Sequence, residues 1–400
     1  MKPRLVRLQS PKGTGEKPVY SALTIMQDRF VAYVHGNDAH VLDLRDDKPG
    51  TPILSVNNGC NYVATQSTLV TYDDEHHFRR FDVDGDRFVP TAQFALPEQP
   101  HPWPTSLTLS PSGRFLAVEV AALPGESSLR VLLLDAVDGR VLGTYPYCLS
   151  ARASFVRLGD SEKLFLSAPD YMSVMFIDPE SGTILHSFES TKSWDFCHTD
   201  YELSADGSRL LVFGCIWAAP YEARLYDATP WTQNRPLSQG EFPLPTVYRQ
   251  YEDLEYETVY IPRFTKNVEG LLDVNGSVSL HGLRKLDTEA LKELRDGLSG
   301  MNAAILDAAL GLEGNVALLQ RRVDPASGNV VDFKLVPVRA MREMHTHPLP
   351  DHRVLIVDET IQWFDGEKLH DVGTIEQCKS YYCSAVTSDG SVIVVRELVD

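Results

Sequence analysis

Histidines and carboxylates gather in a short segment near the C-terminal end of the sequence. His345 and His347 are two residues apart, and Asp351 and His352 follow closely. Side chains two apart on a strand point to the same face, so both imidazoles could bind one metal ion. Prolines flank the segment, and no third ligand is held in register with the two histidines. We therefore assign no metal ligand, and whether His345, His347 and His352 bind a metal stays open.

A second cluster, Asp73-Asp74-Glu75-His76-His77, combines carboxylates with imidazoles. These groups could perform acid–base chemistry or bind a cation. The cluster also lies between two apolar runs, where a hairpin would connect two strands. Loop tips of this kind are routinely polar. We expect a solvated hairpin here rather than a catalytic site.

Tyrosines alternate with four acidic residues in the segment 248–257, which reads YRQYEDLEYE. Tyrosine supplies rigid contact area, and the carboxylates favour a basic partner. The segment is our preferred candidate for a binding surface, and a plain exposed loop stays open as the alternative. Trp103, which stands between Pro102 and Pro104, is a weaker candidate of the same kind.

Known catalytic and cofactor motifs are missing from the sequence. It contains no G-x-S-x-G, no P-loop and no G-x-G-x-x-G, so we assign no catalytic residue and no cofactor. The 37 Lys and Arg residues against 55 Asp and Glu residues give a net charge of −18. A field of that sign repels phosphate backbones and anionic lipids, and no run of five basic residues offsets it. We therefore expect protein partners and neither nucleic acid nor a membrane.

Cysteine spacing and hydropathy indicate a cytoplasmic protein. The six cysteines are scattered without a C-x-x-C pair, which fits reduced, buried thiols. The first residues carry charge but no following apolar stretch of the kind a signal peptide has. No apolar run approaches the roughly 18–20 residues that a membrane span needs.

One short phrase recurs along the chain: an apolar run, then Asp, a short gap and Gly. An apolar strand would end at the Asp, whose side chain bonds the turn backbone, and Gly would take the positive φ that other residues resist. The phrase therefore predicts hairpin corners. Its copies are Leu132–Asp135 with Gly139, Met175–Asp178 with Gly182, Phe81-Asp82 with Gly85, Leu271–Asp273 with Gly276, and Trp363–Asp365 with Gly366.

A second phrase, Ser or Thr, two residues and Gly, precedes β-rich runs. It occurs at residues 110–113, 204–207 and 387–390, with a degenerate copy at 158–161. Gly113 and Gly207 are 94 residues apart (207 − 113), and Asp160 lies midway at 47. A period in the forties is typical of four-stranded propeller blades.

The two phrases predict one all-β domain over residues 1–400, a β-propeller of seven or eight four-stranded blades. We place the blades at 20–56, 58–99, 103–147, 151–190, 194–244, roughly 246–340 and 343–376. Residues 380–398 supply two strands of a last sheet, which the N-terminal strand Arg4–Gln9 would complete. Such closure leaves fewer free sheet edges.

A helical insertion is expected near residues 284–311. Asp287 or Thr288 would cap a helix with a stripe of Leu291, Leu294 and Leu298, ending at Gly297. A second helix would span Met301–Leu310 and close at Gly311. We expect this insertion to pack on the rim or plug a channel mouth; a docking element is the alternative.

The repeated phrases resemble those of the WD-repeat-like and quinoprotein-dehydrogenase-like (YVTN-type) propeller superfamilies. The chain lacks the Gly-His dipeptide of true WD repeats, and its Trp194-Asp195 pair lies at a blade entrance. The resemblance implies architecture and carries over no catalytic residue.

The resulting functional hypothesis is a non-catalytic protein-interaction scaffold of unspecified role. The alternative is a propeller-type hydrolase or lactonase-like enzyme with a small-molecule or metal site at a central channel.

Overall fold

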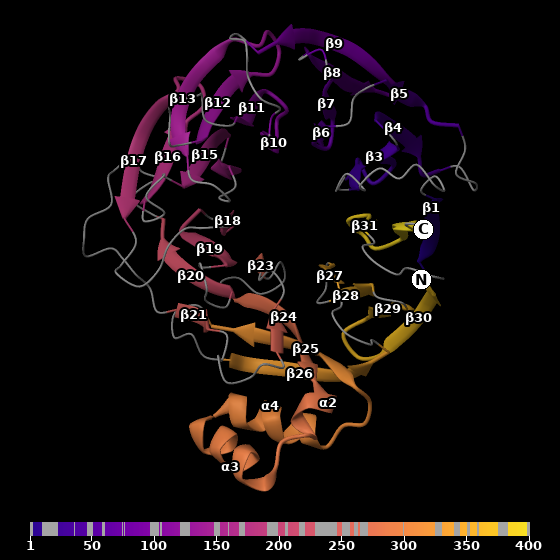
Figure 1. Ribbon diagram of the computed structural model, residues 1–400, viewed down its shortest axis with the longest axis vertical. Coiled ribbons are helices and arrows are strands. Elements are labelled where there is room, and N and C mark those ends of the chain that lie inside the picture. The colour runs from indigo at the N-terminus through magenta and orange to yellow at the C-terminus, as the bar shows by residue number, and fades with distance from the viewer. Residues whose placement is uncertain are drawn as a thin grey trace.

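A computed structural model gives the conformation of the chain. It describes residues 3–9, 23–35, 37–45, 51–57, 61–73, 75, 77–96, 104, 106–120, 129–147, 153–158, 160–167, 173–189, 199–204, 207–215, 221–228, 246–249, 257–259, 263–264, 271–298, 300–324, 330–339, 345–349, 353–357, 360–374 and 383–397. Within these residues the strands form eight separate sheets. Figure 1 shows the sheets standing side by side in a ring.

The sheets are numbered along the chain, and each strand of the first four pairs with the next one in sequence. Sheet 1 contains β2 (Thr24–Met26), β3 (Phe30–His35), β4 (Asp38–Asp43) and β5 (Leu54–Val56). Sheet 2 contains β6 (Asn61–Ala64), β7 (Thr68–Tyr72), β8 (His77–Asp84) and β9 (Arg87–Ala95). Sheet 3 contains β10 (Ser106–Leu109), β11 (Phe115–Val120), β12 (Leu129–Asp135) and β13 (Val141–Tyr147). Sheet 4 contains β14 (Ser154–Leu158), β15 (Ser161–Ser167), β16 (Ser173–Asp178) and β17 (Thr183–Glu189).

The remaining sheets vary this plan. Sheet 5 contains β18 (Thr199–Leu203), β19 (Arg209–Cys215), β20 (Tyr221–Asp227) and β21 (Thr246–Arg249). Sheet 6 contains β22 (Glu257–Val259), β23 (Arg263–Phe264), β24 (Leu272–Ser279), β25 (Val316–Val323) and β26 (Val330–Val338). Sheet 7 contains β27 (His345–Pro348), β28 (Val354–Val357), β29 (Thr360–Phe364) and β30 (Leu369–Thr374). Sheet 8 contains β31 (Cys383–Val386), β32 (Val392–Glu397) and β1 (Arg4–Gln9).

Central strands of these sheets are apolar on both faces because a neighbouring sheet covers each face. Every residue of β7, β11 and β28 is buried, whereas the outer strand β9 is exposed along most of its length. Each of six core clusters joins residues of two neighbouring sheets, linking sheets 6, 7, 8, 1, 2, 3 and 4 in that order. The core is therefore a series of layers between sheets, which explains the short apolar runs in the sequence.

The second sequence phrase forms the same turn at three places. In each copy the backbone N–H of the glycine donates to the carbonyl of the first residue, at 2.8–2.9 Å, in the pairs Gly113–Ser110, Gly207–Ser204 and Gly390–Thr387. The hydroxyl of that first residue also accepts from the backbone N–H five positions on. All three glycines have φ between +69° and +75°. The predicted hairpin corner is therefore present in sheets 3, 5 and 8.

The first phrase marks turns in most of its copies, and one copy was interpreted wrongly. Gly139 and Gly182 have φ of +74° and +68°, and each donates to the carbonyl of its Asp, 135 or 178, at 2.9 Å. Gly276, in contrast, lies inside β24 and pairs with Leu319. The predicted corner there is absent because β24 continues from Leu272 to Ser279 as one strand of the sheet.

One predicted blade boundary also needs correction. Residues 246–249 were assigned to the blade that starts at 246, but they form β21, the outer strand of sheet 5. Its register pairs Glu222 with Arg249 and Ala223 with Tyr248. Cross-strand pairing therefore decides the boundary, and no local sequence signal marks it.

The two ends of the chain meet in sheet 8, as predicted. β1 pairs with β32 in parallel over six residue pairs, from Arg4–Val392 to Gln9–Glu397. β31 pairs with the other side of β32 in the antiparallel sense. Figure 1 shows β31 toward the centre of the ring and β1 toward its outside.

Three helices interrupt sheet 6 between β24 and β25: α2 (Leu280–Leu283), α3 (Thr288–Gly297) and α4 (Met301–Leu310). Asp287 caps α3, accepting from the backbone N–H of Glu289 and Ala290. Leu294, Leu298 and Ile305 belong to a core cluster that includes residues of β24, β25 and β26. The helices lie outside the ring, over the outer part of sheet 6 (Figure 1), which confirms rim packing rather than a channel plug.

Within the described residues, no helix is both long and apolar enough to cross a membrane.

Candidate functional site

The histidine segment lies on the inner strand of sheet 7. His345 and His347 are both in β27, opposite Val357 and Leu355 of β28. The Nε2 atom of His347 lies 2.6 Å from the Oγ atom of Ser384 in β31, so this contact joins sheets 7 and 8. Asp351 and His352 fall outside the described residues, among which no group of three or more metal-binding side chains occurs.

Asp73 is buried and organises the turn between β7 and β8. Its Oδ1 atom accepts from the backbone N–H of Glu75 at 3.1 Å and of His77 at 2.9 Å. Its Oδ2 atom lies 3.0 Å from the guanidinium of Arg79. The hairpin was predicted, but its first carboxylate is inside the turn rather than solvated, and Asp74 and His76 lie outside the described residues.

The tyrosine-rich candidate surface connects two sheets. Its first two residues, Tyr248 and Arg249, end β21, and its last residue, Glu257, begins β22. The intervening residues and Trp103 lie outside the described part of the chain, so these binding hypotheses stay predictions.

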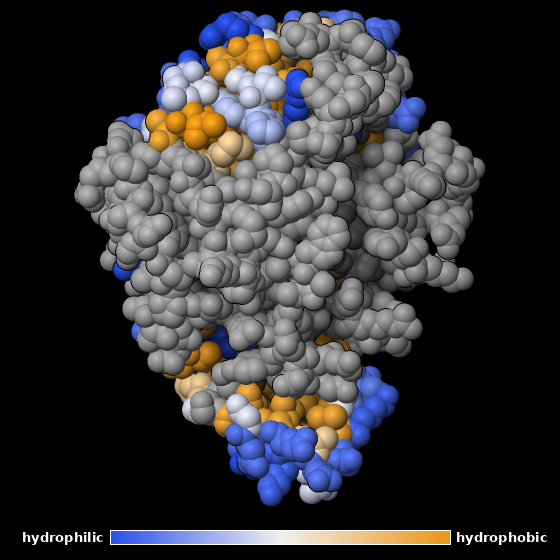
Figure 2. Space-filling view, turned by 60° about the vertical axis from the view of Figure 1, so that its left-hand side comes forward, coloured by the Kyte–Doolittle hydropathy of each residue, from blue (hydrophilic) through white to orange (hydrophobic). Residues whose placement is uncertain are grey.

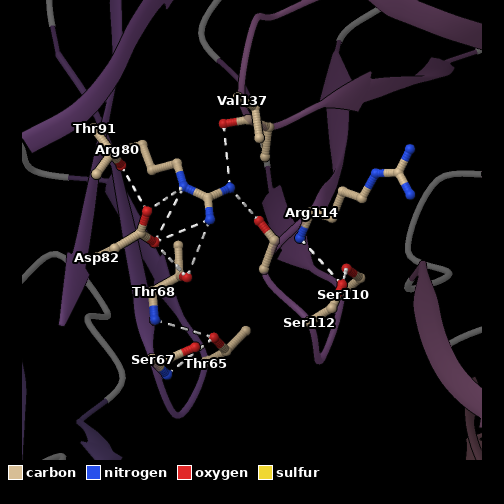
Figure 3. A network of polar contacts seen from close by, with 12 residues as sticks. Thr65, Ser67, Thr68, Arg80, Asp82, Thr91, Ser110, Ser112, Arg114 and Val137 are labelled. Carbon is tan, nitrogen blue, oxygen red and sulfur yellow. Dashed lines mark hydrogen bonds and ion pairs between the residues drawn. The ribbon is translucent and has the colours of Figure 1, made fainter. Parts of the chain in front are cut away.

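The best-defined polar cluster joins sheets 2 and 3 around Arg80 of β8 (Figure 3). The Arg80 guanidinium donates to both oxygens of Asp82, at 3.0–3.2 Å. It also donates to the backbone carbonyl of Gly113 at 2.5 Å and, at 3.5 Å, to that of Ala136, both in turns of sheet 3. Arg80 therefore holds two turns of the neighbouring sheet in place.

Asp82 is the acceptor at the centre of this cluster. The hydroxyls of Thr68 and Thr91 each donate to it at 2.7 Å. Burial alone would raise the pKa of the Asp82 carboxyl, but the hydrogen bonds from Arg80, Thr91 and Thr68 outweigh burial and lower that pKa. Asp82 stays ionised, with its oxygens occupied by donors from three strands, so it is a structural anion rather than a general base.

A similar cluster joins sheets 1 and 2. Arg29 donates to Asp43 at 2.7 and 3.0 Å and to the backbone carbonyl of Gly85 at 3.2 Å. Asp86 lies 2.5 Å from Arg29, and Arg45 binds Asp43 from the solvent side at 2.8 Å. Burial would raise the pKa of Asp43, but hydrogen bonds from Arg29 and Arg45 hold it well below its ordinary value.

A side chain at the same position of several outer strands contacts a turn glycine of the next sheet. The Tyr145 hydroxyl of β13 donates to the carbonyl of Gly182 at 2.6 Å, and Lys334 of β26 donates to the carbonyl of Gly366. At the matching position of β9, the Phe94 ring lies so close to Gly139 that a Cβ atom there would meet it at 2.5 Å. Each of these glycines stands in the turn before the outer strand of the following sheet.

Exposed apolar side chains gather at the same corners of sheets 1 to 4. Among the described residues, seven large apolar side chains are exposed, and six of them lie just before or early in an outer strand. One of the six, Val331, is in β26 of sheet 6. The other five belong to sheets 1 to 4 and have exposed fractions of 38–55%: Ile53, Val89, Val137, Val141 and Ile184. We call these five residues the corner surface. Figure 2 shows hydrophobic residues among hydrophilic ones at the top of the molecule, where Figure 1 places β9.

Sequence reasoning did not find Arg80, Asp82 or the corner surface. The sequence patterns gave Arg80 no role and assigned Asp82 to a turn. Their spacing of two within one strand puts both side chains on the same face, which is the signal that was available. The carbonyls that Arg80 binds are 33 and 56 residues away, so no local pattern indicates them.

Comparisons with known proteins give matches in solved structures alone. No protein-family model and no curated protein sequence matches the chain. The structure of Saccharomyces cerevisiae Sqt1 is similar over 100% of both chains, with 10% identity and a TM-score of 0.52. A eukaryotic initiation factor structure is similar over 95% of this chain and 81% of its own, with 10% identity and a TM-score of 0.47.

A partial match is Kluyveromyces lactis Hsv2p, with 13% identity and a TM-score of 0.34. It covers 51% of this chain and 66% of the Hsv2p chain. At such identities a likeness informs about the fold alone. The eight radial sheets and the full-length likeness to Sqt1 show that this chain has a β-propeller fold built from degenerate repeats.

Proposed function

We propose that the chain is a non-catalytic scaffold, a single propeller domain that binds protein partners through its corner surface. The main observation is that four of these five exposed side chains, those of sheets 2 to 4, lie at corners whose turns accept hydrogen bonds from the preceding sheet. Apolar side chains on rigid backbone lose little entropy on binding, so such positions favour a protein interface. The net charge of −18 disfavours nucleic acid, and the scattered cysteines fit a reduced cytoplasmic compartment.

The polar clusters near these corners support the same proposal. The carboxylates of Asp82 and Asp43 each accept from arginines, and those arginines also bind backbone carbonyls. These carboxylates and arginines are occupied in stabilising the hairpin turns, which argues against a catalytic role for them. Their role is to present the corner surface in one conformation.

The test compares proteins that co-purify with the tagged full chain and with two variants. Val141→Asp with Ile184→Asp places charges in the corner surface, and Val331→Asp makes the same change at an exposed position of β26. We expect the double variant to lose at least one specific partner by about tenfold, since truncating a central contact commonly costs about 1–2 kcal/mol. Thermal unfolding checks that both variants fold. Identical partner sets for the two variants would count against the proposal.

The hydrolase alternative is supported by one contact, the 2.6 Å approach of His347 to Ser384 between two inner strands. A hydroxyl so close to an imidazole is the minimum arrangement for a nucleophile and its base. Reaction of Ser384 with a fluorophosphonate probe, lost in both Ser384→Ala and His347→Ala, would favour this alternative. Elemental analysis of the purified chain tests the metal version of the same idea.

A further inference from the structure

Two histidines lie close together near the turn that joins the two middle strands of sheet 1. His35 is the last residue of β3, and His40 is the third residue of β4. Tyr33 pairs directly with His40, and His35 is two residues further along the same strand. Because alternate residues of a strand share a face, both imidazoles are on the same face of the sheet. Their ring centroids are 6.0 Å apart, and the two ring planes make an angle of 68°.

The distance between these two rings suits a metal ion bound by both. Zn–N bonds are about 2.0–2.1 Å long, and about 1.2 Å separates each nitrogen from its ring centroid, so two rings on one tetrahedral ion lie roughly 5–6 Å apart. Imidazole is a ligand that suits Zn²⁺, Cu²⁺ and Ni²⁺. His35 is exposed, so an ion can reach the pair from solvent, and the His35 side chain can rotate toward it.

His40 is the more firmly held of the two rings. Its Nδ1 atom lies 2.9 Å from the Oγ atom of Ser55 in β5, and its ring centroid is 5.4 Å from that of Tyr33. A proton on Nδ1, directed toward Ser55, leaves the lone pair of Nε2 for a metal, as in most metal-binding histidines. Burial lowers the pKa of His40 against the opposing charge of Asp38, which favours the neutral ring that metals bind. The same negative charge attracts a cation.

We propose that His35 and His40 together bind one divalent transition-metal ion of the zinc type on this face of sheet 1. The site has two protein ligands, in keeping with the described residues, among which no group of three occurs. Its other coordination positions are open to water. A bound ion links β3 to β4 next to their turn. The site is separate from the corner surface and from the histidines of β27, so it goes beyond the proposed scaffold function.

The first experiment titrates the full chain, stripped of metal with EDTA, with Zn²⁺ in an isothermal calorimeter. His35→Ala and His40→Ala each remove one ligand, whereas His281→Ala and His347→Ala change histidines outside the site. We expect saturable Zn²⁺ binding that is at least about tenfold weaker in both site variants and unchanged in both control variants. Thermal unfolding without Zn²⁺ checks that all four variants fold.

The second experiment asks whether the two rings hold the same ion. If they do, the double variant His35→Ala with His40→Ala loses little more Zn²⁺ affinity than either single variant, because each single change already breaks the site. Zn²⁺ should also raise the unfolding temperature of the unmodified chain and not that of either site variant. Absent Zn²⁺ binding, binding unchanged in a site variant, or an equal loss in His347→Ala would overturn the proposal. These outcomes are independent of the corner-surface variants.

Discussion

Arginine side chains at the corners of the ring bind backbone carbonyls as well as carboxylates. Arg29 and Arg80 each neutralise an aspartate of their own sheet and donate to a turn of the next sheet. The planar guanidinium has five donors, enough to serve both acceptors at once. Single side chains therefore link neighbouring repeats.

One prediction concerns acid stability and Asp43. The pKa of Asp43 is lower in the folded chain than in the unfolded chain, so the unfolded chain binds more protons as pH falls. The stabilisation is complete above the ordinary pKa of about 4 and is lost below it. We expect Asp43→Asn to lower stability by about 1–2 kcal/mol at pH 7 and to flatten its decline between about pH 5 and 3. Urea unfolding at several pH values measures the free energy of unfolding of the unmodified chain, of Asp43→Asn and of the exposed control Asp138→Asn. Parallel curves of this free energy against pH for all three proteins would contradict the prediction.

Another prediction concerns Tyr145, whose hydroxyl donates to the carbonyl of Gly182 at 2.6 Å. Burial, and secondly the charge of Asp178, raise the pKa of Tyr145 to about 12, so the hydroxyl is a donor throughout the physiological range. Tyr145→Phe removes that donor and should lower the free energy of unfolding by about 1 kcal/mol. Thr144→Ala, at the exposed neighbouring position, should change it by less. Equal losses of unfolding free energy in the two variants would show that this hydrogen bond does not stabilise the fold.

At the scale of elements, the sequence located turns more reliably than it located the ends of strands. Both sequence phrases correctly located turns at Gly113, Gly139 and Gly182, because each turn depends on residues within five positions of one another. The turn predicted at Gly276 was wrong because the same sequence pattern also occurs inside β24, where pairing with Leu319 decides the conformation. The helix capped by Asp287 was predicted for the same local reason, since capping uses only the first turn.

Two turn glycines provide a matched prediction. Gly182 and Gly85 both have positive φ, at +68° and +59°, so alanine at either site meets the left-handed cost of about 1–2 kcal/mol. At Gly182 a Cβ atom would also lie 1.9 Å from the carbonyl oxygen of Leu142, whereas at Gly85 nothing lies within 4 Å. Gly182→Ala should therefore lose at least about 2 kcal/mol more than Gly85→Ala in urea unfolding. Similar losses would mean that the contact with β13 relaxes freely.

At the scale of the whole molecule, closure of the ring depends on two strands from opposite ends of the chain. Val6 and Leu8 of β1 pack with Val31, Leu42 and other residues of sheet 1, while Leu5 packs with sheet 7. β1 therefore contributes to two layers of core as well as to one ladder. Its loss should affect the entire ring rather than one sheet.

Proline substitutions in β1 test this closure. By alternation from Arg4, the N–H of Val6 faces β32, so Val6→Pro breaks the ladder that closes the ring. We expect it to lower the free energy of unfolding by about 3 kcal/mol or more. Arg7→Pro, whose lost N–H faces outward, should cost clearly less. Thermal unfolding of both variants gives the comparison, and equal midpoints would be evidence against closure through this ladder.

The sequence by itself determined the class of this protein: repeated turn phrases with a period in the forties, central apolar runs and terminal strands available for closure. Those features follow from interactions between residues close in the chain, so they are visible locally. Tertiary structure alone decided the edge of sheet 5 at β21, the parallel pairing of β1 with β32, and the carbonyls that Arg29 and Arg80 bind. The reason is physical: these contacts join residues 22 (246 − 224) to 388 (392 − 4) positions apart, and only the packing of whole sheets brings them together.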